Sequence, residues 1–76
     1  MQNFIKQLKA IEKKFMAEVN DSGYTPNKES YSIDICNRYL SMRIECEDEY
    51  GDTVIVAQEI EQSGNDITAL GIHYDY

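Results

Sequence analysis

The densest group of reactive side chains in this chain is an acidic turn near residue 50. Four carboxylates fall within six residues, those of Glu47, Asp48, Glu49 and Asp52. Such a group can bind Ca²⁺, which requires several converging oxygen ligands, or it can attract a basic partner. The spacing does not match an EF-hand loop, so we interpret the group as a solvated acidic turn and expect no metal site.

The other candidates for chemistry are one histidine, His73, and two cysteines, Cys36 and Cys46. A zinc site would need these residues to converge, and the alternation described below places the two cysteines on opposite faces of the strands. A Cys–His nucleophile pair would also need an activating pocket, for which a domain of this size has little room. We therefore expect a protein that is not an enzyme, holds no cofactor and keeps both thiols reduced.

Alternating apolar residues predict strands over 30–36 and 39–48. The apolar positions are odd in the first strand and even in the second, so a two-residue turn at Asn37-Arg38 keeps them on one face. This turn pairs Ile35 with Leu40, Ile33 with Met42, and Tyr31 with Ile44.

The same reasoning predicts strands over 53–62 and 66–75. A three-residue loop at Glu49-Tyr50-Gly51, with Gly51 at the left-handed position, pairs Cys46 with Val54, Ile44 with Val56 and Met42 with Gln58. Ser63-Gly64-Asn65 predicts another three-residue loop, which pairs Val54 with Tyr74, Val56 with Ile72 and Gln58 with Leu70. A two-residue turn there would point Leu70 and Ile72 away from the core.

Helical periodicity covers residues 3–20, where the apolar stripe consists of Phe4, Ile5, Leu8, Ile11, Phe15, Met16 and Val19. Residues 21–29, which contain the single proline, Pro26, read as a loop that reverses the chain. The sequence therefore predicts one α+β domain over 1–76, with an N-terminal amphipathic helix packed on one face of a four-stranded antiparallel β-meander.

Charge is distributed unevenly along the chain. Residues 1–43 carry seven bases and five acids, whereas residues 44–76 carry nine acids and no lysine or arginine, for a net charge of −7. Four lysines, Lys6, Lys9, Lys13 and Lys14, lie on the outer side of the predicted helix. We interpret them as a solvated face, because the strands need the helix as a cover and it is then not free to lie on a membrane.

The sheet face opposite the helix is predicted to carry Tyr39, Glu45, Ile55, Ala57, Glu59, Glu61, Ala69, Gly71 and His73. An acidic surface disfavours nucleic acid and anionic membranes and favours a basic protein, although excess carboxylates can also serve solubility alone. Tyrosine is a common interface anchor. The predicted partner-binding residues are Tyr39, Glu45, Glu47, Asp48, Glu49, Tyr50, Asp52, Glu59 and Glu61.

No continuous apolar leader or spanning segment is present, so the cytoplasm is the expected location. In size, acidity and lack of an active-site motif, the chain resembles phage-encoded anti-defence proteins such as anti-CRISPR proteins and DNA mimics, which share no common motif. This resemblance implies a small inhibitor, in a bacterial host cytosol, that blocks a basic nucleic-acid-binding protein. Two alternatives remain: an immunity protein or antitoxin against a basic nuclease toxin, and a homo-oligomerising module that pairs through the open sheet face.

Overall fold

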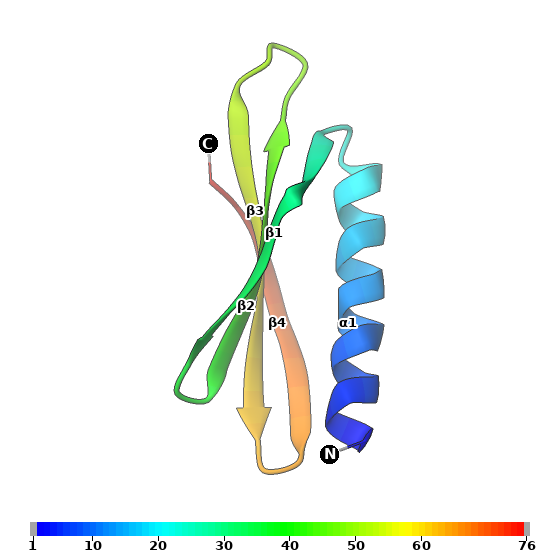
Figure 1. Ribbon diagram of the computed structural model, residues 1–76, viewed down its shortest axis with the longest axis vertical. Coiled ribbons are helices and arrows are strands. Elements are labelled where there is room, and N and C mark those ends of the chain that lie inside the picture. The colour runs from blue at the N-terminus through cyan, green and yellow to red at the C-terminus, as the bar shows by residue number, and fades with distance from the viewer. Residues whose placement is uncertain (1, 76) are drawn as a thin grey trace.

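The computed structural model describes residues 2–75, which form one helix and one four-stranded sheet. The elements are α1 (Gln2–Asp21), β1 (Thr25–Cys36), β2 (Tyr39–Glu47), β3 (Thr53–Ser63) and β4 (Asp66–Asp75). Neighbouring strands are antiparallel, in the order β1-β2-β3-β4, and α1 lies along one face of the sheet (Figure 1). The predicted α+β fold is confirmed. The helix in the described part of the chain is not long and apolar enough to cross a membrane.

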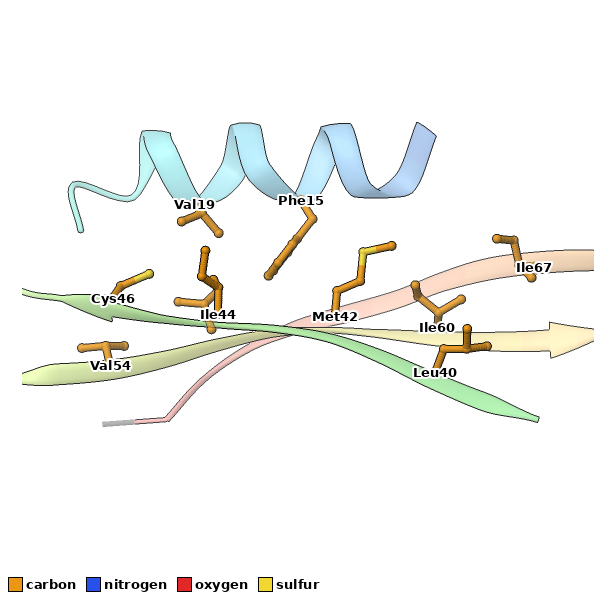
Figure 2. Close-up of a cluster of buried hydrophobic side chains, with 10 residues drawn as sticks. Phe15, Val19, Leu40, Met42, Ile44, Cys46, Val54, Ile60 and Ile67 are labelled. Carbon is orange, nitrogen blue, oxygen red and sulfur yellow. The ribbon is translucent and has the colours of Figure 1, made fainter. Parts of the chain in front are cut away.

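The core is a single apolar layer between α1 and the sheet. Phe15 and Val19 are fully buried, and Figure 2 shows them pointing from the helix toward the strands. The sheet contributes the even positions of β2 and β3 together with one residue of β4, namely Leu40, Met42, Ile44, Cys46, Val54, Val56, Ile60 and Ile67. Because strand side chains alternate between faces, this layer takes every second residue of β2 and β3 and leaves the others on the far face.

The helical stripe is confirmed apart from one residue. Phe4, Leu8, Ile11 and Met16 are partly buried and pack at the margin of the core. Ile5 was expected to widen the stripe, but about half of it is exposed, because it lies at the flank of the helix rather than over the sheet.

The first hairpin has the predicted turn, and Asn37 occupies it with a φ of 56°. Ile35 pairs with Leu40 and Ile33 with Met42, as expected. Regular pairing then stops at Ser32, so the predicted pairing of Tyr31 with Ile44 falls in an irregular segment outside the regular ladder.

β1 begins at Thr25, so residues 25–29, expected in a loop, belong to the strand. A wide bulge between Asn27 and Ser32 separates its two halves. The Ser30 hydroxyl closes this bulge: it donates to the Asn27 carbonyl at 2.6 Å and accepts from the Glu45 N–H at 2.8 Å. Pro26 is tolerated because β1 is an edge strand.

The β2–β3 hairpin has the predicted register throughout, with Cys46 opposite Val54, Ile44 opposite Val56 and Met42 opposite Gln58. Gly51 has a φ of 82°, the left-handed conformation that the loop was expected to require.

The β3–β4 hairpin differs from the prediction. Ser63 pairs with Asp66, so the turn has two residues, Gly64 and Asn65, rather than three. Leu70 consequently points outward and is 53% exposed. A bulge in β4 opposite Glu59 then adds one residue and shifts the register, which brings Ile72 opposite Gln58 and back against the core. Gln58, which is buried, donates its Nε2 hydrogens to the carbonyls of Glu59 and Gly71 beside this bulge.

Side-chain hydrogen bonds attach α1 to both edge strands. On the β1 side, the Tyr31 hydroxyl donates to Glu12 Oε2 at 2.6 Å. On the β4 side, the Ile67 N–H donates to Gln7 Oε1 at 3.0 Å. Burial raises the pKa of Tyr31 above its ordinary value, and the hydrogen bond to Glu12 and the charge of Glu12 add to the shift.

The burial of Ile60 and the exposure of Ile35 can be tested by making the same substitution at both positions. Ile60→Val should lower the free energy of unfolding by about 0.5–1.5 kcal/mol, because Ile60 is fully buried. Ile35→Val should change it by less than about 0.5 kcal/mol, because Ile35 is 73% exposed. Urea unfolding of dilute protein measures both values, and equal losses would contradict the assigned faces.

The Tyr31–Glu12 contact predicts a pH effect. Because the pKa of Tyr31 is higher in the folded state than its ordinary value of 10.0, unfolding releases a proton above about pH 10. The stabilisation is complete below that pH and is lost as pH rises further. Tyr31→Phe should therefore show a shallower alkaline loss of stability than the natural chain, measured by urea unfolding between neutral and alkaline pH. Tyr50→Phe, which removes an exposed phenol, is the control and should keep the natural slope.

Candidate functional site

The acidic turn is a compact loop held by Asp48. Asp48 Oδ1 accepts hydrogen bonds from the backbone N–H groups of Tyr50 and Asp52, each at 2.9 Å. The Asp48 backbone also donates to the Asp52 carbonyl at 3.0 Å and accepts from the Gly51 N–H at 3.1 Å. The Asp48 carboxylate is therefore engaged inside the loop, and its main effect is to shape the turn.

The other side chains of the turn face solvent. Tyr50 is 81% exposed, and Glu47, Glu49 and Asp52 are exposed as well. In Figure 1 the β2–β3 turn extends past the connection between α1 and β1, so it forms one tip of the elongated molecule. We call the residues 47–52 the acidic tip.

An open hollow of about 370 Å³ lies beside the acidic tip. It is bounded on one side by the α1–β1 connection and on the other by the turn, through Ser22, Gly23, Tyr24, Asp48, Glu49 and Tyr50. The Tyr24 and Tyr74 rings pack with their centroids 6.0 Å apart. The connection thus flanks the acidic tip, which gives an approaching side chain a concave surface at its base.

The other predicted partner-binding residues lie on the sheet face opposite α1. Tyr39 pairs with Glu61 at one end of β2, whereas Glu45 and Glu47 lie toward the acidic tip, and Glu59 pairs with Ser41. Tyr39 and Glu47 are eight residues apart on one strand, which is roughly 27 Å at about 3.4 Å per residue. The structure therefore divides the predicted site into two groups at opposite ends of β2 instead of bringing it together.

Arg43 separates these two groups, although it was not among the residues predicted for the open face. Arg43 lies opposite Ala57 in the middle of this face, and its Nη1 is 3.5 Å from Asp34 Oδ2. Arg38 lies near the far end, with its Nε 4.0 Å from Glu61 Oε2 and its guanidinium over the Tyr39 ring. The hydrogen bond and the electrostatic interaction with Tyr39 raise the pKa of Arg38, and the charge of Glu61 adds to this shift.

Alternation would have revealed Arg43, because position 43 has the same parity as Glu45. The register also moves Ala69, which was expected on the open face: it pairs with Ile60 and so falls on the helix side. The centre of the open face is a hollow of about 240 Å³ lined by Asp34, Ser41, Arg43, Ile55, Ala57, Glu59, His73 and Asp75.

The two cysteines lie on opposite faces of the sheet, as predicted, and both are free thiols in the structure. Cys46 is buried, and this burial raises the pKa of its thiol, so it is a poor nucleophile. Cys36 is exposed near the β1–β2 turn. Across residues 2–75, no three histidine, cysteine, aspartate or glutamate side chains are grouped so that they could hold a metal ion.

Comparison of the chain with protein-family models, with curated proteins and with solved structures finds no match.

The structural role of Asp48 as a hydrogen-bond acceptor in the turn can be separated from its negative charge. Asp48→Asn keeps an oxygen at Oδ1 and should leave stability within about 0.5 kcal/mol of the natural chain. Asp48→Ala removes the acceptor of two backbone hydrogen bonds and should cost about 1–2 kcal/mol by analogy with the loss of a cap. Urea unfolding measures both, and a loss as large for the asparagine variant as for the alanine variant would contradict the structural role.

Proposed function

We propose that this protein is a small non-enzymatic inhibitor, of the anti-CRISPR or DNA-mimic kind, that binds a basic nucleic-acid-binding protein and blocks it. The observation that carries the proposal is the acidic tip, which projects from the fold with Glu47, Glu49, Asp52 and Tyr50 exposed. Glu45 adjoins it on the open face, and Glu59 and Glu61 form the second group.

The tip is favoured over the middle of the sheet as the binding surface because the arginines that could neutralise carboxylates lie in the sheet and not at the tip. Within residues 2–75 the ion pairs join Arg38 to Glu61 and Arg43 to Asp34, and both arginines lie away from the tip. The carboxylates of Glu47, Glu49 and Asp52 are thus free to attract lysine or arginine side chains. A continuous row of phosphate-like charges along the whole sheet is disfavoured, since Arg43 interrupts it.

Tyr50 supplies the apolar contact that charge alone does not give. An exposed tyrosine at the end of a rigid hairpin offers a large contact area and a hydroxyl at low entropic cost. A basic groove that accommodates nucleic acid would receive such a hairpin tip with its carboxylates against the residues that otherwise bind phosphates.

An immunity protein or antitoxin directed at a basic nuclease would use the same electrostatics, so the identity of the captured partner separates it from the first proposal. The third candidate, pairing of open faces through Ile55, Ala57, Ala69 and Gly71, is weakened because Ala69 leaves that face and Arg43 enters it.

The experiment compares two triple charge reversals with equal changes in net charge. The tip variant is Glu47→Lys, Glu49→Lys and Asp52→Lys; the matched control is Glu18→Lys, Asp21→Lys and Asp66→Lys, all exposed in the structure. Tagged proteins are used to capture partners from a lysate of the source organism. The purified partner is then assayed for association rate and for binding to a labelled nucleic acid.

The natural chain and the control should capture a nucleic-acid-binding protein and prevent it from binding the labelled nucleic acid. The tip variant should associate at least about tenfold more slowly, with a smaller change in dissociation rate, and higher salt should weaken binding. Equal binding by the tip and control variants, or a partner that still binds nucleic acid normally, would contradict the proposal.

A further inference from the structure

The sheet is open, so β1 and β4 each have an edge that no strand within residues 2–75 covers. Parts of both edges have features that oppose further pairing. β4 has a bulge between Ala69 and Ile72, and the first half of β1 contains Pro26, Lys28 and its own bulge. The segment 32–36 at the end of β1 is different, since it is regular and has no proline, lysine or bulge. We call it the free edge.

Hydrogen bonds between the ends of β2 and β3 show which backbone N–H and C=O groups of the free edge point outward. The Asp48 N–H donates to the Asp52 carbonyl, and the Gln62 N–H donates to the Arg38 carbonyl. These bonds place the backbone groups of even β2 residues toward β3 and those of odd residues toward β1. Ser32, Asp34 and Cys36 lie opposite odd β2 residues and pair with them. The N–H and C=O groups of Ile33 and Ile35 therefore point away from the sheet.

The side chains of the free edge also favour a partner. Ile35 is 73% exposed although it belongs to the apolar alternation, because the β1–β2 turn lies away from the N-terminal half of α1 (Figure 1). On the other face, Asp34 is paired with Arg43. Its charge, which would otherwise oppose pairing, is partly balanced within the same chain.

We propose that the free edge pairs with the free edge of a second copy of this chain, antiparallel about a twofold axis through Ile33. Ile33 then lies opposite Ile33 of the second copy, and Ile35 lies opposite Tyr31. The outward groups of the two Ile33 residues form a hydrogen-bonded pair, and Tyr31 of the second copy, which lies in the irregular segment of β1, covers Ile35 on the helix side. On the open face, Ser32 lies opposite Asp34 of the second copy, where its hydroxyl donates to the carboxylate. An axis through Asp34 would instead place two like charges directly opposite, which is unfavourable.

The sign of the salt dependence distinguishes this dimer from binding of a basic partner. Each copy has a net charge of −7, so two copies repel each other and screening strengthens their association. The paired segment is short, so the dimer is expected to be reversible and to form only at high protein concentration. The acidic tip lies at the other end of β2 and stays exposed, so the proposed function and the dimer can fail independently.

Sedimentation velocity over a wide concentration range tests the association. The natural chain should shift from monomer to dimer, and higher salt should move this shift to lower concentration. Ile35→Lys should abolish the shift, because it places a charge in the paired apolar row. Leu70→Lys is the matched control: it adds the same charge at an exposed apolar residue of the other edge strand, and it should dimerise at least as well as the natural chain. Circular dichroism confirms that each variant is folded. A natural chain that stays monomeric at every concentration, or equal dimerisation by both variants, would overturn the proposal.

Disulfide trapping tests the register in a Cys36→Ser background, where the remaining native thiol is buried. Ile33→Cys should cross-link readily under mild oxidation, because opposite residues in a hydrogen-bonded pair have Cα atoms about 5.5 Å apart, within the range that a disulfide spans. Leu70→Cys should remain mostly reduced. Cross-linking through Asp34→Cys in preference to Ile33→Cys, or through neither, would contradict pairing about Ile33.

Discussion

The constraint on which this structure depends is that it has one apolar layer, closed on one side by a single helix. The strands place most of their large apolar residues on the face that α1 covers, because no element within residues 2–75 covers the opposite face. In β2 and β3 simple alternation achieves this, with Met42, Ile44 and Val56 fully or almost fully buried. In the edge strands it does not, and each edge strand contains a bulge that corrects the phase.

The same constraint determines where the charges are. Since α1 occupies one face, its lysines are on the outside of the molecule, while the odd residues of β2 and β3 are on the opposite outer face. That face is mixed and not uniformly acidic, because Arg43 shares the parity of Glu45 and forms an ion pair with Asp34. The β2–β3 turn lies beyond the helix and beyond both arginines, and it is there that carboxylates are least balanced by cations. The acidic character on which the proposed function rests is thus a property of a turn, whose shape depends on Asp48, more than of a sheet surface.

Much of the fold could be predicted from the sequence, because alternation and turn residues are local signals. Asn37 and Gly51 lie where their loops require a left-handed residue, and they predicted the turns of the first two hairpins correctly. The predicted register of the third hairpin was wrong because it required both Leu70 and Ile72 to face the core. In the structure Leu70 is exposed, and a bulge returns Ile72 to the core face. No local sequence pattern predicts that combination. Within the candidate site, the parity of Arg43 was available from the sequence, but the internal use of Asp48 depends on hydrogen bonds that only the folded loop reveals.

The most direct test of this account is the register of β3 against β4, measured by nuclear Overhauser effects between Cα protons. Ile60 and Ala69 form a non-hydrogen-bonded pair in the described structure, with Cα atoms about 4.5 Å apart in such pairs, so a strong effect between their Cα protons is expected. If the turn had three residues and no bulge followed it, Ile60 would lie opposite Thr68 instead. An effect between Ile60 and Thr68 in place of Ala69 would contradict the conclusion that a bulge keeps β4 in phase with the single apolar layer.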